Sequence, residues 1–175
     1  MLSYIEHRTA GVHFASTSVL KELDDVQVRF LHQLELSEES AFMNWNLAPL
    51  GVRRDIAMLG VIHRAAHQDG PPELWKFFRR DFRPTARASR RPRHSFQMVE
   101  WPHGRNLDIA RRSAFGMIRV YNLLPSDVVL NVDLKSFQRA LTNLVRDRVE
   151  GGDSRWKVTL SCRHVFLQYH PLVRA

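Results

Sequence analysis

The stretch GVRRDIAMLGVIHRAAHQ, residues 51–68, shows the repeat on which the fold prediction depends. Apolar residues recur at three- and four-residue intervals, which places them along one side of an α-helix. These residues are Val52, Ile56, Leu59, Ile62 and Ala66. Arg53 and Arg64, eleven residues apart, fall on another side. Gly70, Pro71 and Pro72 follow, so the segment predicts an amphipathic helix that ends before them.

The same periodicity continues on both sides of this helix. An earlier helix is predicted from an apolar set with Ser18 as its N-cap, and this set is Leu20, Leu23, Val26, Phe30, Leu31 and Leu34. Ser37, followed by two glutamates, predicts the start of a short helix through Trp45 that closes at residues 46–49. Residues 73–80 are expected to add a short helix whose aromatic residues pack rather than stack on bases.

Two more helices are predicted in the second half. One begins near Ala110, directs Phe115, Ile118 and Tyr121 inward, and stops before Pro125. The other begins at Asp133 as N-cap and ends at Gly151 and Gly152, with an apolar face of Leu134, Phe137, Leu141, Leu144 and Val145. Residues 94–101 alternate enough to allow one short strand or hairpin. The prediction is a mainly α protein.

Composition changes abruptly at residues 79–93, RRDFRPTARASRRPR, which contain seven arginines and one acid and are interrupted by two prolines. This run supplies six of the eight net positive charges. Such a segment cannot bury a core, so we expect it to be extended or disordered until it meets phosphates. The predicted organisation is an N-terminal helical lobe at 1–78, a basic linker or arm at 79–93, a C-terminal helical lobe at 94–150 and an irregular tail at 151–175.

Charge and cysteine content limit the function classes. A net charge of +8 and a pI near 10.5, mostly from arginine, favour a polyanionic partner, with nucleic acid ahead of a membrane surface. One cysteine, Cys162, excludes an internal disulfide and any zinc site with two thiolates. No run of about 20 apolar residues predicts a membrane span. We expect a nuclear or cytoplasmic location, with mitochondrial import as an alternative because residues 1–21 contain one acid.

Three groups of residues contain side chains of the kinds used in catalysis or metal binding. His63 and His67, four apart on a helix, could share a metal ion, but a core histidine is the favoured interpretation because no glutamate follows the first histidine. Cys162 and His164 are too close in sequence for an ordinary nucleophile and base. Asp24 and Asp25 are interpreted as solvated helix acids. No catalytic residue, metal or cofactor is therefore expected.

The order of several short blocks is more specific than any one of them. Residues 23–30 (LDDVQVRF) and 47–54 (LAPLGVRR) precede the basic segment, and YNLLP at 121–125 precedes Ser136, Phe137 and Leu141. This order resembles the region that follows the reverse transcriptase domain in LINE-type (non-LTR) retrotransposon proteins, over roughly residues 3–149. Tyr121 departs from that pattern, which has tryptophan there, and the tail from Gly151 has no counterpart.

The resemblance implies a non-catalytic nucleic-acid-binding tail that lies beside a polymerase, because the aromatic-x-Asp-Asp turn of the polymerase is missing. The alternative is a transposon-derived structural subunit of a larger assembly, with an organellar assembly included, and its partners would be protein subunits. If the chain is instead the nucleic-acid-binding tail, its expected partner is the backbone of RNA or DNA. The candidate contacts are Arg53, Arg54, Arg79, Arg80, Arg83, Arg87, Arg90, Arg91, Arg93, Arg111, Arg112, Arg139 and Arg146.

Overall fold

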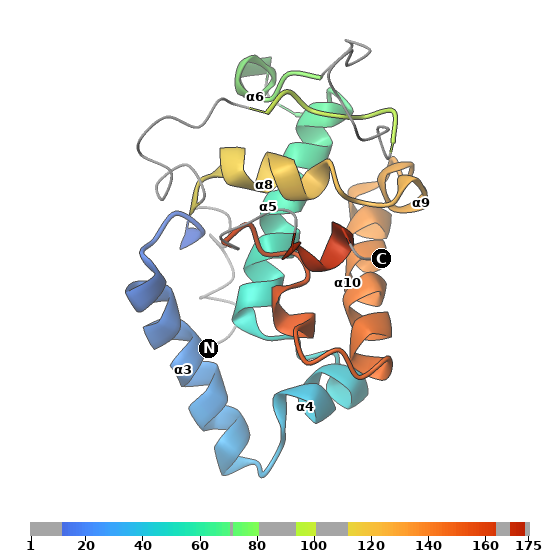
Figure 1. Ribbon diagram of the computed structural model, residues 1–175. Coiled ribbons are helices and arrows are strands. Elements are labelled where there is room, and N and C mark those ends of the chain that lie inside the picture. The colour runs from blue at the N-terminus through green and yellow to red at the C-terminus, as the bar shows by residue number, and fades with distance from the viewer. Residues whose placement is uncertain (1–11, 71, 81–93, 101–111, 164–168, 174–175) are drawn as a thin grey trace.

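A computed structural model of the chain describes residues 12–70, 72–80, 94–100, 112–163 and 169–173 (Figure 1). Its elements in chain order are α3 (Thr17–Gln33), α4 (Glu38–Trp45), α5 (Leu50–Ala66), α6 (Pro72–Phe77), α8 (Ala114–Tyr121), α9 (Ser126–Val129), α10 (Leu134–Glu150) and two short 3-10 helices, η1 (Trp156–Val158) and η3 (Pro171–Val173). The prediction of a mainly α fold is confirmed. In place of the short strand predicted at 94–101, the described part of that segment makes one isolated antiparallel bridge, between Arg80 and Met98.

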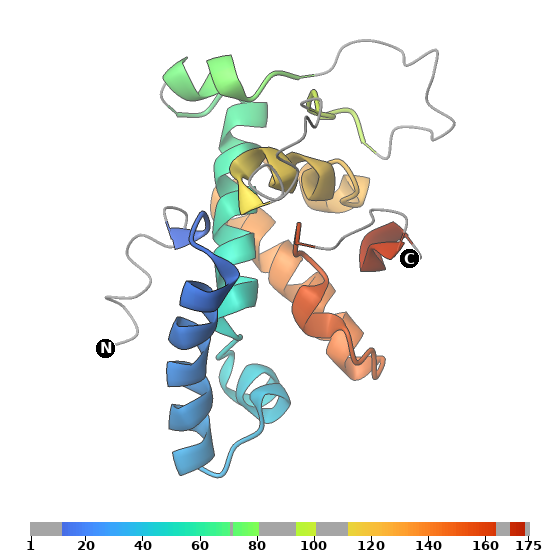
Figure 2. The same ribbon diagram turned by 60° about the vertical axis from the view of Figure 1, so that its left-hand side comes forward.

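Helix α5 runs through the middle of the molecule, with α3 along one side and α10 along another (Figures 1 and 2). Helix α8 crosses α5 at the end remote from α4. Gly60 permits the close contact of α5 with α10, because a Cβ atom there would lie 3.1 Å from both Leu134 Cδ1 and Gln138 Nε2. Most of α5 is buried, including every residue of its predicted apolar side.

Side-chain caps define where the helices begin. Ser37 and Asp133 accept hydrogen bonds from the backbone N–H groups of Ser40 and Ser136, as predicted. Helix α3 is capped by Ser16 rather than by Ser18, and α8 starts at Ala114 rather than near Ala110. The short helix α9 occupies the residues after Pro125, where the sequence predicted only a helix stop.

One hydrophobic core includes residues from both predicted lobes. Phe42 and Ile62 come from the first, Tyr121 and Phe137 come from the second, and all belong to the same buried cluster. The described parts of the two lobes therefore pack against each other directly, and residues 79–93 do not separate two cores.

The tail after Gly152 also contributes to this core, although no periodicity predicted it. Trp156 is 2 % exposed, and its indole stacks on Phe42 at a centroid distance of 5.6 Å. Leu160 and Leu172 are buried in the same cluster. The irregular tail predicted at 151–175 is thus irregular in secondary structure but, in its described residues, part of the packed interior.

The orientation of α3 differs from the prediction. Of its expected apolar face, only Leu20 and Leu31 are buried, while Val26, Phe30 and Leu34 are exposed. Gln27 is buried instead, because its side chain bridges to the start of α5: Nε2 donates to the Ala48 carbonyl at 3.1 Å and Oε1 accepts from the Leu50 N–H at 2.8 Å. Satisfying these two backbone groups fixes the side of α3 that faces the core.

Replacing Gln27 should therefore destabilise the fold more than replacing an exposed glutamine of the same helix. Gln27→Leu leaves a buried carbonyl and a buried N–H unsatisfied, which should lower the free energy of unfolding by roughly 1 to 3 kcal/mol. Gln33→Leu, at an exposed position of the same helix, should change it by less than about 0.5 kcal/mol. Urea unfolding followed by circular dichroism measures both, and equal effects would contradict the bridging role.

Phe137 was predicted to be a core residue and is fully buried, as is Tyr121. Phe137→Ala should lower the free energy of unfolding by about 3 to 5 kcal/mol, because it removes a large side chain from a packed interior. Val132→Ala, at a side chain that is 74 % exposed, serves as the control and should have little effect. A thermal melt of Phe137→Ala that matches the parent would refute the packing of α10 against α5.

Candidate nucleic-acid interface

The arginine-rich segment begins at a fixed point of the fold. The Val99 N–H donates to the Arg79 carbonyl at 2.8 Å, next to the Arg80–Met98 bridge. The Arg80 guanidinium lies 4.4 Å from the centre of the Phe96 ring, which is a cation–π contact. Arg80 also donates to the Ser95 carbonyl at 3.4 Å. Hydrogen bonds and a cation–π contact therefore hold residues 79 and 80 against residues 95–99.

Residues 94–98 are in turn fastened to the C-terminal end of α8. His94 is buried, and its Nε2 donates to the Tyr121 carbonyl at 3.0 Å while its Nδ1 accepts from the Phe96 N–H at 3.2 Å. The Asn122 side chain accepts from the Met98 N–H at 2.8 Å and donates to the Met98 carbonyl at 2.9 Å. Burial lowers the pKa of His94, so the imidazole is neutral, as this bonding pattern requires.

These contacts bring the two ends of the basic segment together. The chain leaves the helical core at Arg80 and returns to the same place at His94. Five of the predicted contacts, Arg83, Arg87, Arg90, Arg91 and Arg93, lie between these points and outside the described residues. The predicted linker thus starts and finishes beside α8, at the end of the molecule where α6 lies (Figure 1).

Arg54 does not have the role that the sequence suggested. It is 5 % exposed, and its Nη2 donates to both carboxylate oxygens of Asp24, at 2.7 and 2.8 Å. Removing Asp24 would leave the buried Arg54 guanidinium without its carboxylate partner, so the pair ties α5 to α3. Asp24 is correspondingly not a freely solvated acid, and Arg54 is a structural residue rather than a phosphate contact. Arg53 beside it is half-buried.

The remaining predicted arginines are dispersed. Arg139 is exposed on α10. Arg146, about two turns further along the same helix, donates to the Phe42 carbonyl and to Asn46 Oδ1 of the α4 region. Arg112 is half-buried just before α8, and Arg111 lies outside the described residues. Arg146 contacts the α4 region, whereas Arg80 follows α6 closely in the chain. Helices α4 and α6 lie at opposite ends of the molecule (Figure 1), so the described arginines do not form one continuous track.

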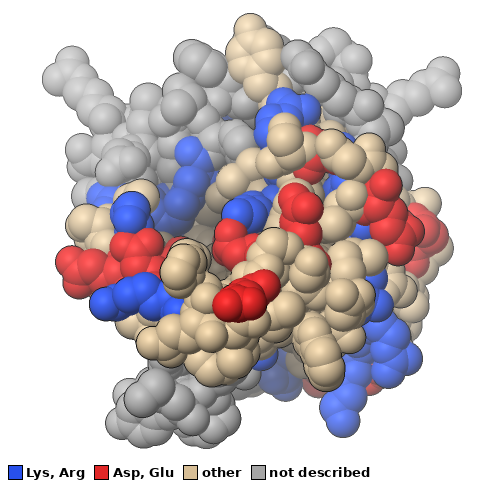
Figure 3. Space-filling model, turned by 90° about the horizontal axis from the view of Figure 1, so that it is seen from below, with Lys and Arg blue, Asp and Glu red and all other residues tan. Residues whose placement is uncertain are grey.

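The face seen from below supports this conclusion, since acidic and basic side chains alternate over it (Figure 3). Several of the cations there and elsewhere are paired with acids. Such pairs include Lys21 with Asp25, Arg148 with Asp153, and Lys157 with Glu38. On this face, therefore, the described cations are interspersed with acids and do not form a uniformly basic surface.

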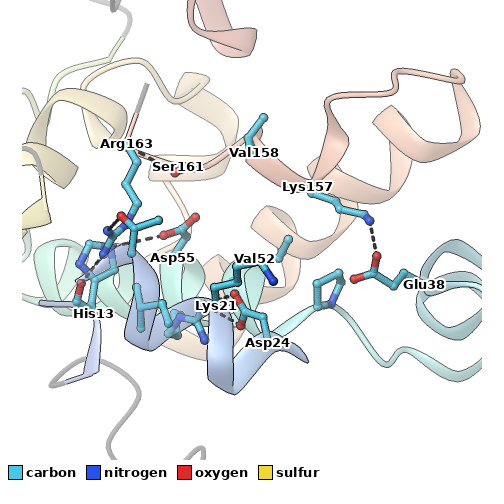
Figure 4. Close-up of a pocket in the computed structure, with 15 residues that line it drawn as sticks. His13, Lys21, Asp24, Glu38, Val52, Asp55, Lys157, Val158, Ser161 and Arg163 are labelled. Carbon is cyan, nitrogen blue, oxygen red and sulfur yellow. Dashed lines mark hydrogen bonds and ion pairs between the residues drawn. The ribbon is translucent and has the colours of Figure 1, made fainter. Parts of the chain in front are cut away.

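A pocket of about 330 Å³ lies between α3, α5 and residues 157–163 (Figure 4). In its wall, His13 Nε2 stands 3.3 Å from Asp55 Oδ1, with both residues buried. Burial raises the pKa of Asp55, opposed by the hydrogen bond and charge of His13. Arg163 donates to the His13 carbonyl at 2.9 Å and to Thr17 Oγ1 at 3.1 Å.

Sequence reasoning missed this cluster, because His13, Asp55 and Arg163 are far apart along the chain and share no motif. The His13–Asp55 contact and the hydrogen bonds of Arg163 connect the first described residues to α5, while His13 Nδ1 has no hydrogen-bond partner among the described residues. Cys162 beside it is buried, which raises the pKa of its thiol to about 12 and keeps it protonated. Among the described residues, no group of three or more His, Cys, Asp or Glu side chains is arranged to hold a metal ion.

His63 is a core histidine, as the favoured interpretation had it. Its ring stacks on Phe137 at 3.8 Å, and Nε2 donates to the Asn131 carbonyl at 2.8 Å. Nδ1 must then accept from the Tyr121 hydroxyl, 3.2 Å away. Burial lowers the pKa of His63 to about 4. His67 stacks on Phe96 at 4.2 Å, so these rings join α10 and α5 to the segment that anchors Arg80.

No family model, curated protein or solved structure matches this chain. Within the part of the chain that the structure describes, no helix is both long and apolar enough to cross a bilayer.

The lowered pKa of His63 makes stability depend on pH. Because the folded-state pKa lies below the unfolded value near 6.5, the stabilisation is complete above about pH 6.5 and is lost as pH falls toward 4. Between pH 7 and pH 5 this residue alone should reduce the free energy of unfolding by about 2 kcal/mol. His67 and His94 act in the same direction, since burial lowers both pKa values.

Urea unfolding at several pH values tests this, with two variants. His63→Gln removes the titrating group and should flatten the dependence, whereas Tyr121→Phe removes only the hydroxyl and should keep it while lowering stability at every pH. A His63→Gln variant whose pH dependence equals that of the parent would show that other groups dominate.

Proposed function

We propose that this chain is a non-catalytic module that binds the backbone of RNA or DNA through residues 79–93. We further propose that it corresponds to the tail that follows the reverse transcriptase domain in LINE-type retrotransposon proteins. The observation that carries the first proposal is the position of the two ends of the basic segment: Arg80 and His94 are both held beside α8, so the segment begins and ends at one place on a packed core.

Closure matters energetically because a bound segment must be ordered. A segment tethered at both ends has fewer conformations to lose on binding than one tethered at one end, so less of the interaction energy is spent on ordering it. Each guanidinium can donate two parallel hydrogen bonds to a phosphate, which an ammonium group cannot. The segment is therefore suited to recognise a phosphate backbone without reading base sequence.

The helical core supports this role through its rigid attachment points. Arg80 stacks on Phe96, Phe96 stacks on His67, and His67 is the C-cap residue of the central helix α5. Phe77, two residues before Arg79, is 54 % exposed and provides an aromatic surface near the same end of the molecule. A nuclear or cytoplasmic location fits such a role.

A structural subunit of a larger assembly is the second candidate function. It is favoured by large apolar side chains that the described structure leaves exposed, including Trp45 at 71 % and Leu130 at 60 %. In that case the arginines would bind an acidic protein or a structural RNA. The assembly could be mitochondrial, and the chain would copurify with fixed protein partners.

The salt dependence of binding distinguishes these candidates. Affinity for labelled single-stranded RNA and duplex DNA should fall steeply with salt, by about 0.7 and 0.9 logarithmic units per phosphate contact and per decade of salt. Replacing Arg87, Arg90, Arg91 and Arg93 by Gln should flatten the slope by roughly 3 units and weaken all sequences alike. The fold should be unchanged, because the core described above is formed by other residues.

A variant with the same loss of charge provides the control. Lys21, Arg64, Lys135 and Arg155 are exposed in the described part of the chain, and their replacement by Gln should change the slope by less than the arginine variant does. If the Arg87–Arg93 variant binds as the parent does, the segment is not the binding element and the subunit function becomes the better supported one. Metal-dependent primer extension by the purified chain would contradict a non-catalytic role.

A further inference from the structure

Helix α3 carries a row of apolar side chains on its solvent side. Val19, Val26 and Phe30 are 47, 39 and 45 % exposed, and Leu23 between them is half-buried. Their spacing of four, three and four residues places them in one stripe along the helix. A continuous apolar stripe on a surface helix is typical of a surface that another protein covers.

The core of this chain cannot cover the stripe, because another side of α3 already faces it. Leu20, Gln27 and Leu31 pack inward, and both Gln27 and Asp24 are bonded to α5. Turning α3 to bury the stripe would break these buried contacts. The stripe therefore remains on the outside while the fold is intact, and Figure 2 shows α3 at the edge of the molecule.

We propose that the stripe packs against the same stripe of a second copy of this chain, with the two α3 helices antiparallel about a two-fold axis. Positions separated by four, three and four residues form the seam of a two-stranded coiled coil. In the antiparallel register, Leu23 of one copy packs on Val26 of the other, and Val19 packs on Phe30. Each of these layers occurs twice by symmetry, which makes the surface self-complementary.

The charges beside the stripe select this arrangement. Glu22 and Arg29 lie on the same edge of it, seven residues apart. In the antiparallel register, Glu22 of one copy faces Arg29 of the other, and symmetry forms the pair twice. A parallel pair would instead bring Glu22 opposite Gln27, which is already buried against α5. Complementary charges at such flanking positions set helix orientation.

Other occupants fit the surface less well. Nucleic acid would gain nothing from the apolar side chains, and Glu22 would repel its phosphates. An anionic lipid surface would meet the same acid, while the basic Lys21 is already paired with Asp25 at 2.7 Å. A second copy supplies a stripe of the same length together with the reversed charge pattern.

Sedimentation velocity of the nuclease-treated full chain over a range of concentrations tests the proposal. The parent should form dimers. Phe30→Asp, which places a charge in the seam, should weaken dimerisation by at least about 100-fold. Val28→Asp is the matched control, since Val28 is 44 % exposed on a different side of the same helix, and it should leave dimerisation unchanged. A parent that is monomeric throughout, or an equal response of both variants, would overturn the proposal.

Charge reversal tests the orientation. Glu22→Arg and Arg29→Glu should each weaken dimerisation by about tenfold, because like charges then face each other twice. The double variant E22R/R29E should recover the parent affinity, and a double variant as weak as either single one would overturn the antiparallel pairing. Circular dichroism checks that all variants are folded. RNA binding by Phe30→Asp should persist, so failure of this proposal is distinguishable from failure of the proposed function.

Discussion

Helix α5 places three polar side chains in the interior, those of Arg54, Asp55 and His63. The arrangement of the rest of the chain depends on supplying hydrogen-bond or ion-pair partners for these three groups. A buried charge or imidazole without a partner costs several kcal/mol, so each must be met by a group from another element. Asp24 of α3 accepts hydrogen bonds from Arg54, and His13 lies within ion-pair distance of Asp55. The Tyr121 hydroxyl and the Asn131 carbonyl form hydrogen bonds with the ring of His63. The positions of α3, α8 and the start of α10 follow from these pairings as much as from hydrophobic contact.

The helices themselves were predictable from sequence because local rules determine them. Periodic apolar residues, Ser37 and Asp133 as caps, and the two glycines after residue 150 gave the locations of α4, α5 and α10. The orientation of α3 was not predictable, because it depends on a glutamine that bonds to backbone groups more than twenty residues away. Trp156 and Leu172 were missed for a related reason: burial through tertiary contact leaves no periodic trace in a short irregular segment.

The candidate site, like the fold, was predictable from sequence only in part. Composition alone identified residues 79–93, since a dense arginine run is visible without any structure. What composition could not show is that Arg80 and His94 meet beside α8, or that Arg54 belongs to an internal ion pair. An arginine in a sequence has the same appearance whether its guanidinium faces a phosphate or a buried carboxylate, and only the partner's position decides between them.

The meeting of residues 80 and 94 also bears on how this protein can vary. When both ends of a segment are fixed at one place, doubling its length costs only about 0.6 kcal/mol in closure entropy. Lengthening the segment between these two residues would thus cost the fold little in closure entropy. The same closure makes the position a natural exchange point, at which recognition segments from other proteins could be grafted onto a scaffold that stays the same.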